Sequence, residues 1–179
     1  MTITPLSVSG ALLLRPKIYE DARGSFAETY NQEISESIGC PTFVQDNESH
    51  SKRGVLRGLH YQVMKPQGKL VRVAAGEIFD VIVDLRKSSP TFGKHCSVVL
   101  SGHNRHILWV PAGFAHGFVT LSESAILVYK CTEKYSPQDE RTLIWNDPDL
   151  GIRWPRNEMP LLSPKDARGL RFHDAEVYI

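Results

Sequence analysis

The chain of 179 residues has almost no excess charge and no long apolar run. Its 21 Lys and Arg residues nearly balance its 20 Asp and Glu residues, which gives a formal net charge of +1. A chain without a broad positive field cannot hold nucleic acid or an anionic membrane by bulk electrostatics, so its ligand must be recognised at a local site. The longest apolar run, Ala125–Tyr129, is far too short for a transmembrane helix. We expect neither a nucleic-acid partner nor a membrane partner.

Cysteine is also scarce. Cys40, Cys96 and Cys131 are too few and too scattered for a disulfide framework or a zinc site, and an odd number suits a reducing compartment. We expect each of them to be a small apolar residue that is buried or nearly so. The N-terminus shows no basic segment leading into a signal-type apolar stretch, so the cytoplasm is the expected location.

What the chain does contain is the composition of a folded domain, with 41% hydrophobic and 23% charged residues. From Ala11 to about Thr132 it runs through short segments rich in Val, Ile, Phe and Tyr, separated by Gly, Pro, Asn and Ser, which is typical of strands. About ten such strands predict an all-β sandwich or jelly roll. The expected strands are Ala11–Arg15, Ser25–Tyr30, Phe43–Asn47, Val55–Gln62, Lys69–Ala75, Ile78–Leu85, His95–Leu100, His106–Val110, Gly117–Thr120 and Ala125–Thr132.

The segment Ile78–Leu85 shows the clearest alternation. Its apolar residues Phe79, Val81, Val83 and Leu85 share one face, whereas Asp80 and Asp84 lie on the other. We expect the first face in the core and the second to be polar or to line a cavity.

Helical structure is expected in only a few places. Asn31–Ile38 is a short helical stretch that Asn31 can cap. After Tyr135, Pro-containing turns, two tryptophans and clustered Asp predict loops and short helices on the sheet. With no linker or internal repeat, residues 1–179 are expected to form a single domain.

A basic stretch from Ser49 to Gly76 contains no Asp or Glu over 28 residues, where the chain average predicts about three. Because Arg57 and Lys69 lie inside apolar strands, and a buried cation needs an anionic or polar partner, the stretch favours an anionic ligand such as a phosphate or a developing enolate. A solvated basic edge that discourages strand pairing is the alternative. The six cations are Lys52, Arg53, Arg57, Lys65, Lys69 and Arg72.

His60 is a candidate general base, because imidazole titrates near neutral pH. Strict alternation places Arg57 and His60 on opposite faces, but Gly58 between them is typical of a bulge, which would turn both toward one cavity. A core histidine is the alternative. The base would need a carboxylate partner, for which the pattern leaves Asp46, Asp80, Asp84 and Asp166 eligible.

Other candidates lie further along the chain. His116 follows a turn with Pro and Gly, and either fills that turn or serves the site. Tyr129 closes the longest apolar run; facing a cavity it could donate a proton, since tyrosine has an unperturbed pKa of about 10, and core packing is the alternative. No nucleophile motif, phosphate-binding Gly-rich loop, HExxH or CxxC occurs, and no pair of histidines two apart follows His60. We therefore do not expect metal catalysis, although His60, His116 and one carboxylate could meet in space.

Eight segments, taken in order, together resemble the dTDP-4-dehydrorhamnose 3,5-epimerase family. The resemblance extends over nearly the whole chain, from Asp21 to about Asp166. The segments are Gln45–Asn47, Gly54–Gln62, Gln67–Val73, Phe79–Val81, Asp84–Arg86, Ser89–Gly93, Pro111–Phe118 and Trp145–Pro148. The resemblance implies a double-stranded β-helix, the cupin jelly roll, a homodimer and a metal-free site in the barrel. Pro111–His116 looks like the second cupin motif, but Thr120 stands where metal-binding cupins usually carry Asn.

The resemblance also implies the reaction and the residues that carry it. The substrate would be dTDP-4-dehydro-6-deoxy-D-glucose, inverted at C3 and C5 next to the C4 ketone without a cofactor. By the match, His60 is the base, Asp166 its carboxylate partner, Lys69 the cation near the C4 oxygen and Tyr129 the proton donor. Tyr135 matches the aromatic that stacks on thymine. The remaining matched binding residues are Arg23, Glu28, Gln45, Asp46, Asn47, Arg57, His116, Glu140 and Lys165.

Three alternatives stay open on the sequence. The chain could be a dTDP-keto-sugar epimerase that inverts only C3 or only C5, or a non-catalytic cupin that binds a sugar nucleotide. A metal-dependent cupin oxygenase or isomerase is the third, and it predicts stoichiometric bound metal.

Overall fold

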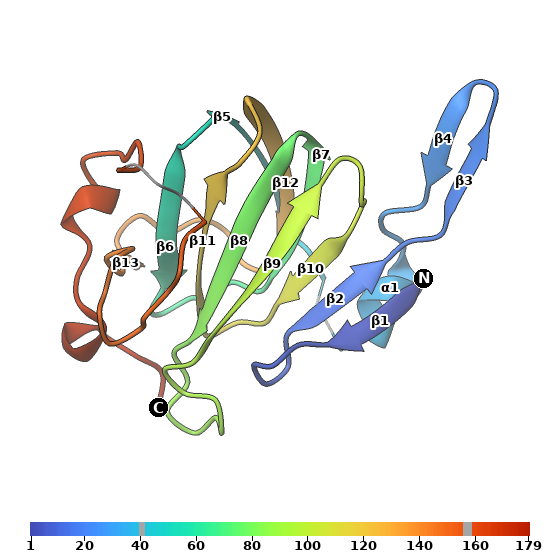
Figure 1. Cartoon of the computed structure of the whole chain (residues 1–179). Helices are drawn as coiled ribbons and strands as arrows, with labels where there is room; N and C mark the ends of the chain where they lie inside the picture. The colour runs from blue at the N-terminus through green and yellow to red at the C-terminus, as the bar shows by residue number, and fades with distance from the viewer. Residues whose placement is uncertain (40–41, 156–158) are drawn as a thin grey trace.

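Two antiparallel β-sheets stack face to face in the computed structural model, which describes residues 1–39, 42–155 and 159–179 (Figure 1). The six-stranded sheet has the order β1 (Thr2–Pro5), β2 (Leu12–Arg15), β10 (Ile107–Val110), β7 (Lys69–Ala75), β12 (Ser124–Cys131), β5 (Gln45–Lys52). The five-stranded sheet has the order β13 (Glu140–Thr142), β6 (Leu56–Gln62), β11 (Phe114–Thr120), β8 (Glu77–Asp84), β9 (His95–Ser101). This arrangement confirms the all-β jelly-roll prediction.

A separate hairpin, β3 (Ile18–Asp21) with β4 (Gly24–Ala27), extends away from the two sheets (Figure 1). Its aromatic side chains are exposed, with Tyr19 at 54% and Phe26 at 68% of their full accessible surface. The two rings contact one another at a centroid distance of 6.5 Å. An apolar pair on a projecting hairpin is costly to leave in water, which bears on the assembly of the protein.

The core between the sheets is apolar and is built from inward-facing residues of both sheets, among them Val71, Ile78, Phe114, Phe118 and Leu127. A second core covers the outer face of the five-stranded sheet. There the C-terminal part of the chain packs on that face, with Leu143, Leu150 and Trp154 against Val81 and Val83. Burial of apolar surface in these layers is the main force that holds the barrel closed.

A third core lies on the outer face of the six-stranded sheet. Helix α1 (Gln32–Ser37) packs Ile34 there, with Ile38 just after it, against Leu14, Leu70 and Ile107. The predicted cap is confirmed, because the Asn31 side chain accepts a hydrogen bond of 2.8 Å from the Ile34 backbone N–H.

The prediction for the strand at residues 78–85 is half right. Val81, Val83 and Leu85 do face the outer core, but the face that carries Asp80 and Asp84 is no less buried. Ile78 and Ile82 share that inward face and pack in the core between the sheets. The inward face therefore mixes apolar packing with carboxylates that are hydrogen-bonded to protein groups.

Three strands were not predicted: β1, β3 and β13. They are three or four residues long and lack alternation; β1 and β3 are mostly exposed and β13 is half-buried, so pairing with a neighbour decides their conformation. The short C-terminal helices are confirmed as two 3-10 turns, η1 (Asp166–Arg168) and η2 (Phe172–Asp174).

The predicted burial of the cysteines holds for Cys131, which is fully buried, and Cys96 is half-buried. Cys40 lies outside the described residues. No helix within the described ranges is long and apolar enough to span a membrane.

Candidate active site

A polar cavity opens between the two sheets beside the apolar core. It consists of two adjoining hollows of about 180 and 190 Å³ that share His60, Lys69 and Tyr129, and we call the two together the barrel cavity. The other lining residues are Gln45, Asn47, Ser49, Arg57, Tyr61, Gln62, Gln67, His116, Gly117, Phe118, Leu127, Tyr135 and Glu140.

His60 on β6 is held by one carboxylate. Its Nε2 lies 2.5 Å from Oδ1 of Asp166, and the Ser163 hydroxyl donates a 2.8 Å hydrogen bond to the other carboxylate oxygen. Burial acts to raise the pKa of Asp166, but the hydrogen bonds and charge of His60, with Ser163 and the Gly58 N–H, outweigh it and the pKa is lowered. Of the four carboxylates left open by the pattern, Asp166 is thus the one that meets His60, as the family resemblance implies.

The predicted bulge at Gly58 is confirmed and places His60. Along the β6 and β11 pair, His60 lies opposite His116 while Arg57 lies opposite Phe118, so β6 holds one extra residue. Gly58 has a φ of 119°, and a Cβ there would lie 2.5 Å from the Cα of Gly117. Only glycine allows this close approach, which turns Arg57 and His60 toward the barrel cavity.

Lys69 on β7 is a buried cation in the wall opposite His60, with 8% of its surface exposed. Burial lowers its pKa, an effect that Cys131, Asp80 and Glu140 partly counter. Among the described side chains no carboxylate forms an ion pair with it. An ammonium group in such a place favours an anion or a strongly polarised oxygen as ligand.

Tyr129 on β12 lines both hollows of the barrel cavity. Burial raises the pKa of its phenol above the usual 10, so the hydroxyl keeps its proton at neutral pH. Because β12 belongs to the six-stranded sheet and β6 to the five-stranded one, Tyr129 and His60 approach the cavity from opposite walls.

A second histidine–carboxylate pair lies beside the first. Nε2 of His116 is 2.9 Å from both carboxylate oxygens of Asp80, and both residues are buried. Burial raises the pKa of Asp80, opposed by His116 and Lys69. His116 thus lies on strand β11 and lines the cavity rather than filling a turn, and its Asp80 partner fixes the ring.

The rim of the barrel cavity carries a chain of polar contacts. The Tyr135 hydroxyl donates a 2.8 Å hydrogen bond to Glu140, whose other oxygen lies 2.8 Å from Nζ of Lys165. The Tyr135 backbone N–H donates to the side chain of Gln45, and the Gln45 amide donates to Asn47. Lys165 directly precedes Asp166, so one turn of chain supports both the rim and the His60 pair.

Arg57 corrects part of the prediction for the basic stretch. It was expected to be a buried cation inside an apolar strand, but it is exposed and only lines the cavity edge, where its Nε donates to the Ser51 hydroxyl at 3.0 Å. The bulge explains the difference, because its extra residue breaks the in–out alternation of side chains that was assumed for Arg57. Only Lys69 fits the expectation of a buried strand cation.

The structure does not bring Asp46, Arg23 or Glu28 to the barrel cavity. Asp46 alternates away from Gln45 and Asn47 and pairs with Lys130 at 2.8 Å on the outer face. Arg23 lies at the turn of the β3–β4 hairpin and pairs with Asp21.

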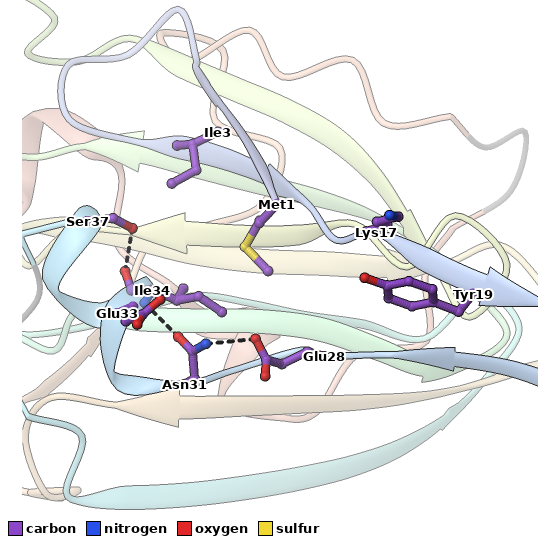
Figure 2. Close-up of a pocket in the computed structure, with 9 residues that line it drawn as sticks. All are labelled: Met1, Ile3, Lys17, Tyr19, Glu28, Asn31, Glu33, Ile34 and Ser37. Carbon is purple, nitrogen blue, oxygen red and sulfur yellow. Dashed lines mark hydrogen bonds between the residues drawn. The ribbon is translucent and has the colours of Figure 1, made fainter.

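Glu28 lies in a separate hollow of about 400 Å³ near α1 and the base of that hairpin, lined also by Met1, Ile3, Lys17 and Tyr19, where it accepts a hydrogen bond from the Asn31 amide (Figure 2). Within one chain, therefore, neither Glu28 nor Arg23 lines the barrel cavity.

Several lining residues were not singled out from the sequence, namely Ser49, Tyr61, Gln62 and Gln67. Gln62 could have been found, because it stands two residues after His60 and a strand places such residues on the same face. Ser163, which supports Asp166, comes from an irregular segment that offers no periodic signal.

No group of three or more His, Cys, Asp and Glu side chains in the described part of the chain is placed to hold a metal ion. His60 and His116 are cross-strand neighbours, but each is bonded to its own carboxylate. The absence of a metal and of a cofactor from the reaction stays a prediction.

Comparison with known proteins agrees with this geometry. The family model described as dTDP-4-dehydrorhamnose 3,5-epimerase matches residues 5–174. Curated relatives of that name include one from Pseudomonas aeruginosa, 52% identical over 99% of both chains, and one from Salmonella typhimurium, 54% identical over 93% of both.

A crystal structure of the Legionella pneumophila 3,5-epimerase in complex with dTDP-4-keto-L-rhamnose superposes with a TM-score of 0.94 at 47% identity, covering 98% of this chain and 94% of that one. The predicted cupin jelly roll is confirmed by this likeness. The chain belongs to the dTDP-4-dehydrorhamnose 3,5-epimerase family, a family of isomerases.

Proposed function

We propose that this protein inverts C3 and C5 of dTDP-4-dehydro-6-deoxy-D-glucose to give dTDP-4-dehydro-L-rhamnose. The observation that carries the proposal is the placement of a carboxylate-held histidine and a half-buried tyrosine on opposite walls of one cavity that also holds a buried lysine. Membership of the family and the ligand of the Legionella structure support the same substrate class.

Proton removal is the first step. The C–H bonds at C3 and C5 are acidic because the carbanion formed at either carbon delocalises into the C4 ketone as an enolate. His60 takes the proton, and the imidazolium that forms is stabilised by the ionised Asp166 at 2.5 Å. Asp166 also holds the ring, so that the free nitrogen is available to the substrate.

Lys69 stabilises the enolate. As negative charge develops on the C4 oxygen, an ammonium group in a water-poor wall interacts with it far more strongly than it would in water. Within the described ranges Lys69 has no ion-pair partner, which makes its charge costly in the free protein. That charge is therefore available to stabilise the transition state.

Tyr129 completes the inversion. Reprotonation on the face opposite His60 inverts the carbon, and Tyr129 reaches the cavity from the opposite sheet with its phenol protonated. Two rounds at the two carbons next to the ketone need only one base and one acid, provided that the ring turns or shifts between rounds.

Binding of the dTDP moiety falls to the polar residues at the edge and rim. Arg57 and His116 suit the diphosphate, because guanidinium and imidazole N–H groups donate to phosphate oxygens. Tyr135 suits stacking on thymine, with Gln45, Asn47, Glu140 and Lys165 as polar neighbours. Asp46 is left out of this assignment, because its side chain faces outward and pairs with Lys130.

We also propose a homodimer. Arg23 and Glu28, matched to substrate contacts, belong to a segment that leaves the barrel, and the exposed Tyr19 and Phe26 rings give that segment an apolar face. A second copy would cover these rings and receive Arg23 and Glu28 at its own cavity. The expected solution mass is about twice 20.1 kDa by light scattering, and Phe26→Asp should shift it toward the monomer; a wild-type monomer would contradict the dimer.

The remaining expectations are a single domain over residues 1–179 and a cytoplasmic location. Free Cys96 and Cys131 in the described chain are consistent with a reducing compartment.

The activity test uses the purified protein with dTDP-4-dehydro-6-deoxy-D-glucose, without added cofactor and after treatment with EDTA. A proton NMR time course should show the sugar ring couplings change to those of the product inverted at both carbons. Product inverted at one carbon would indicate a single-carbon epimerase. Binding without conversion would indicate a non-catalytic cupin, and conversion lost on chelation and restored by metal would indicate a metal enzyme.

A further inference from the structure

The loop of residues 132–139, which we call the rim loop, carries Tyr135 across the mouth of the barrel cavity. It joins β12 of one sheet to β13 of the other and has no regular structure beyond the turn at residues 136–139. Tyr135 is 52% exposed and belongs to none of the three apolar clusters of the described residues. Its position must therefore come from polar anchors.

Gln62 is the main anchor. Its side chain is buried, with 3% of the residue exposed, and all of its amide hydrogens are used. Nε2 donates to the carbonyl oxygens of Lys134 at 3.3 Å and of Lys65 at 2.8 Å, and Oε1 accepts from the Ser136 N–H at 2.8 Å. The Gln62 amide thus binds the backbone on both sides of Tyr135.

Two further glutamines complete the attachment. Oε1 of Gln45 accepts from the Tyr135 N–H at 2.8 Å, and Nε2 of Gln67 donates to the Glu133 carbonyl at 2.8 Å. Both of these are less buried than Gln62, and each makes one bond to the loop. Four consecutive residues of the loop are therefore held by glutamine side chains from β5, β6 and the segment before β7.

We propose that Gln62 is a positioning residue that sets the affinity for the nucleotide end of the substrate by holding Tyr135 at the rim. The inference rests on the proposed function, in which Tyr135 stacks on thymine. A loop that is ordered before binding does not lose conformational entropy when the base arrives, so the stacking energy appears in the affinity. The acid–base groups His60 and Tyr129 make no hydrogen bond to the Gln62 amide, so the chemical step is spared.

The test combines calorimetric titration with dTDP and steady-state kinetics on Gln62→Met, Tyr135→Ala and the double variant. Each single variant should weaken dTDP binding and raise KM about 5- to 100-fold, the range for loss of one base–aromatic stack, with kcat within about threefold of wild type. Because Gln62 acts through Tyr135, the double variant should bind dTDP no more weakly than the single variant that has the lower affinity. Gln32→Met, an exposed glutamine on α1, is the matched control and should bind dTDP as the wild type does.

Gln62→Glu keeps the side-chain length and the acceptor for Ser136 but loses both donors, and it should show the same loss of affinity if Gln62→Met is too unstable to purify. If the Gln62 variants had only a general structural defect, their melting temperature would fall, and the fold-losses of dTDP affinity from the two positions would multiply in the double variant. Multiplying effects, unchanged dTDP affinity in both Gln62 variants, or a fall in kcat without a change in affinity overturns the inference. Failure of the wild-type protein to bind dTDP would overturn the proposed function as well. Binding by the wild type therefore separates failure of the Gln62 inference alone from failure of the proposed function.

Discussion

Replacing Asp166 by Asn tests the role of the His60 pair while changing the size of one buried side chain very little. Asn can still accept a hydrogen bond from Nε2 of His60, but it cannot neutralise the imidazolium that forms when the base takes a proton. Loss of an efficient general base costs about 10²- to 10⁴-fold, so kcat should fall by that factor, or about 3–5 kcal/mol in activation free energy. KM should change little, because the Asp166 carboxylate faces His60 and Ser163 rather than the ligand.

The second pair provides a matched control, because Asp80 holds His116 as Asp166 holds His60. Asp80→Asn loosens a group assigned to binding, so it should raise KM about 10- to 100-fold, the range for hydrogen bonds to charged groups, and leave kcat within about threefold. Both variants are assayed by NMR over a range of substrate concentrations. Equal losses of kcat in the two variants, or more than a tenth of the wild-type kcat in Asp166→Asn, would refute the assignment of His60 as the base.

Asp166→Asn also has a pH signature in stability. The folded-state pKa of Asp166 is lowered below the usual 3.8 of a free Asp side chain. The ionised carboxylate therefore stabilises the fold at higher pH, and this contribution is lost as the pH falls through the folded-state pKa. The difference in melting temperature between wild type and variant should therefore shrink between about pH 5 and pH 3. A constant difference over that range would contradict the lowered pKa.

Three further predictions concern the acid, the enolate site and the bulge. Tyr129→Phe should lower the rate of epimerisation about 10²- to 10⁴-fold while solvent exchange at the substrate C–H bonds continues. Both rates are measured by NMR in D₂O, and an equal loss of the two would argue against Tyr129 as the proton donor. Lys69→Met should lower kcat by at least about 100-fold. Burial lowers the pKa of Lys69 below 10.5, so the charged lysine destabilises the wild-type fold at pH 7. The melting temperature of Lys69→Met should therefore equal or exceed that of wild type at pH 7, and the gain should shrink as the pH rises toward 10.5. A lower melting temperature of the variant at pH 7 would contradict this. Gly58→Ala should destabilise the fold by about 3 kcal/mol, because the new Cβ would clash with Gly117 and the residue would also keep a positive φ. Gly54→Ala, with φ 76° and open space around the Cβ, should cost only about 1 kcal/mol. Equal losses of unfolding free energy in urea would refute the close approach.

The parts of the fold that could be predicted from the sequence are those in which burial on one face imposes a pattern. Lys69–Ala75 is found at the predicted bounds, and most other strands lie within a few residues of them. Strands such as β13 could not be predicted, because its three residues have no alternation and it exists only by pairing with β6. On the inward face of β8, Ile78 and Ile82 pack in the core while Asp80 and Asp84 are hydrogen-bonded to protein side chains, a division that local alternation cannot predict.

The candidate site divides in the same way. Residue chemistry and the glycine in the strand pointed to His60 and to its orientation, and the structure places both as expected. The partner Asp166 lies 106 positions away in a 3-10 turn, so only the family resemblance singled it out before the fold brought the two together. Arg23 and Glu28 show the opposite limit, because the contact that we propose for them in a second copy of the chain would leave no trace in the sequence pattern.

The most direct test of the account is the incorporation of solvent deuterium. Wild-type protein, dTDP-4-dehydro-6-deoxy-D-glucose and D₂O should give deuterium at both C3 and C5 together with inversion at both carbons, and His60→Ala should abolish incorporation at both while remaining folded. Inversion without deuterium at either carbon, or incorporation that survives in His60→Ala at the wild-type rate, would contradict proton transfer through His60 as the basis of the reaction.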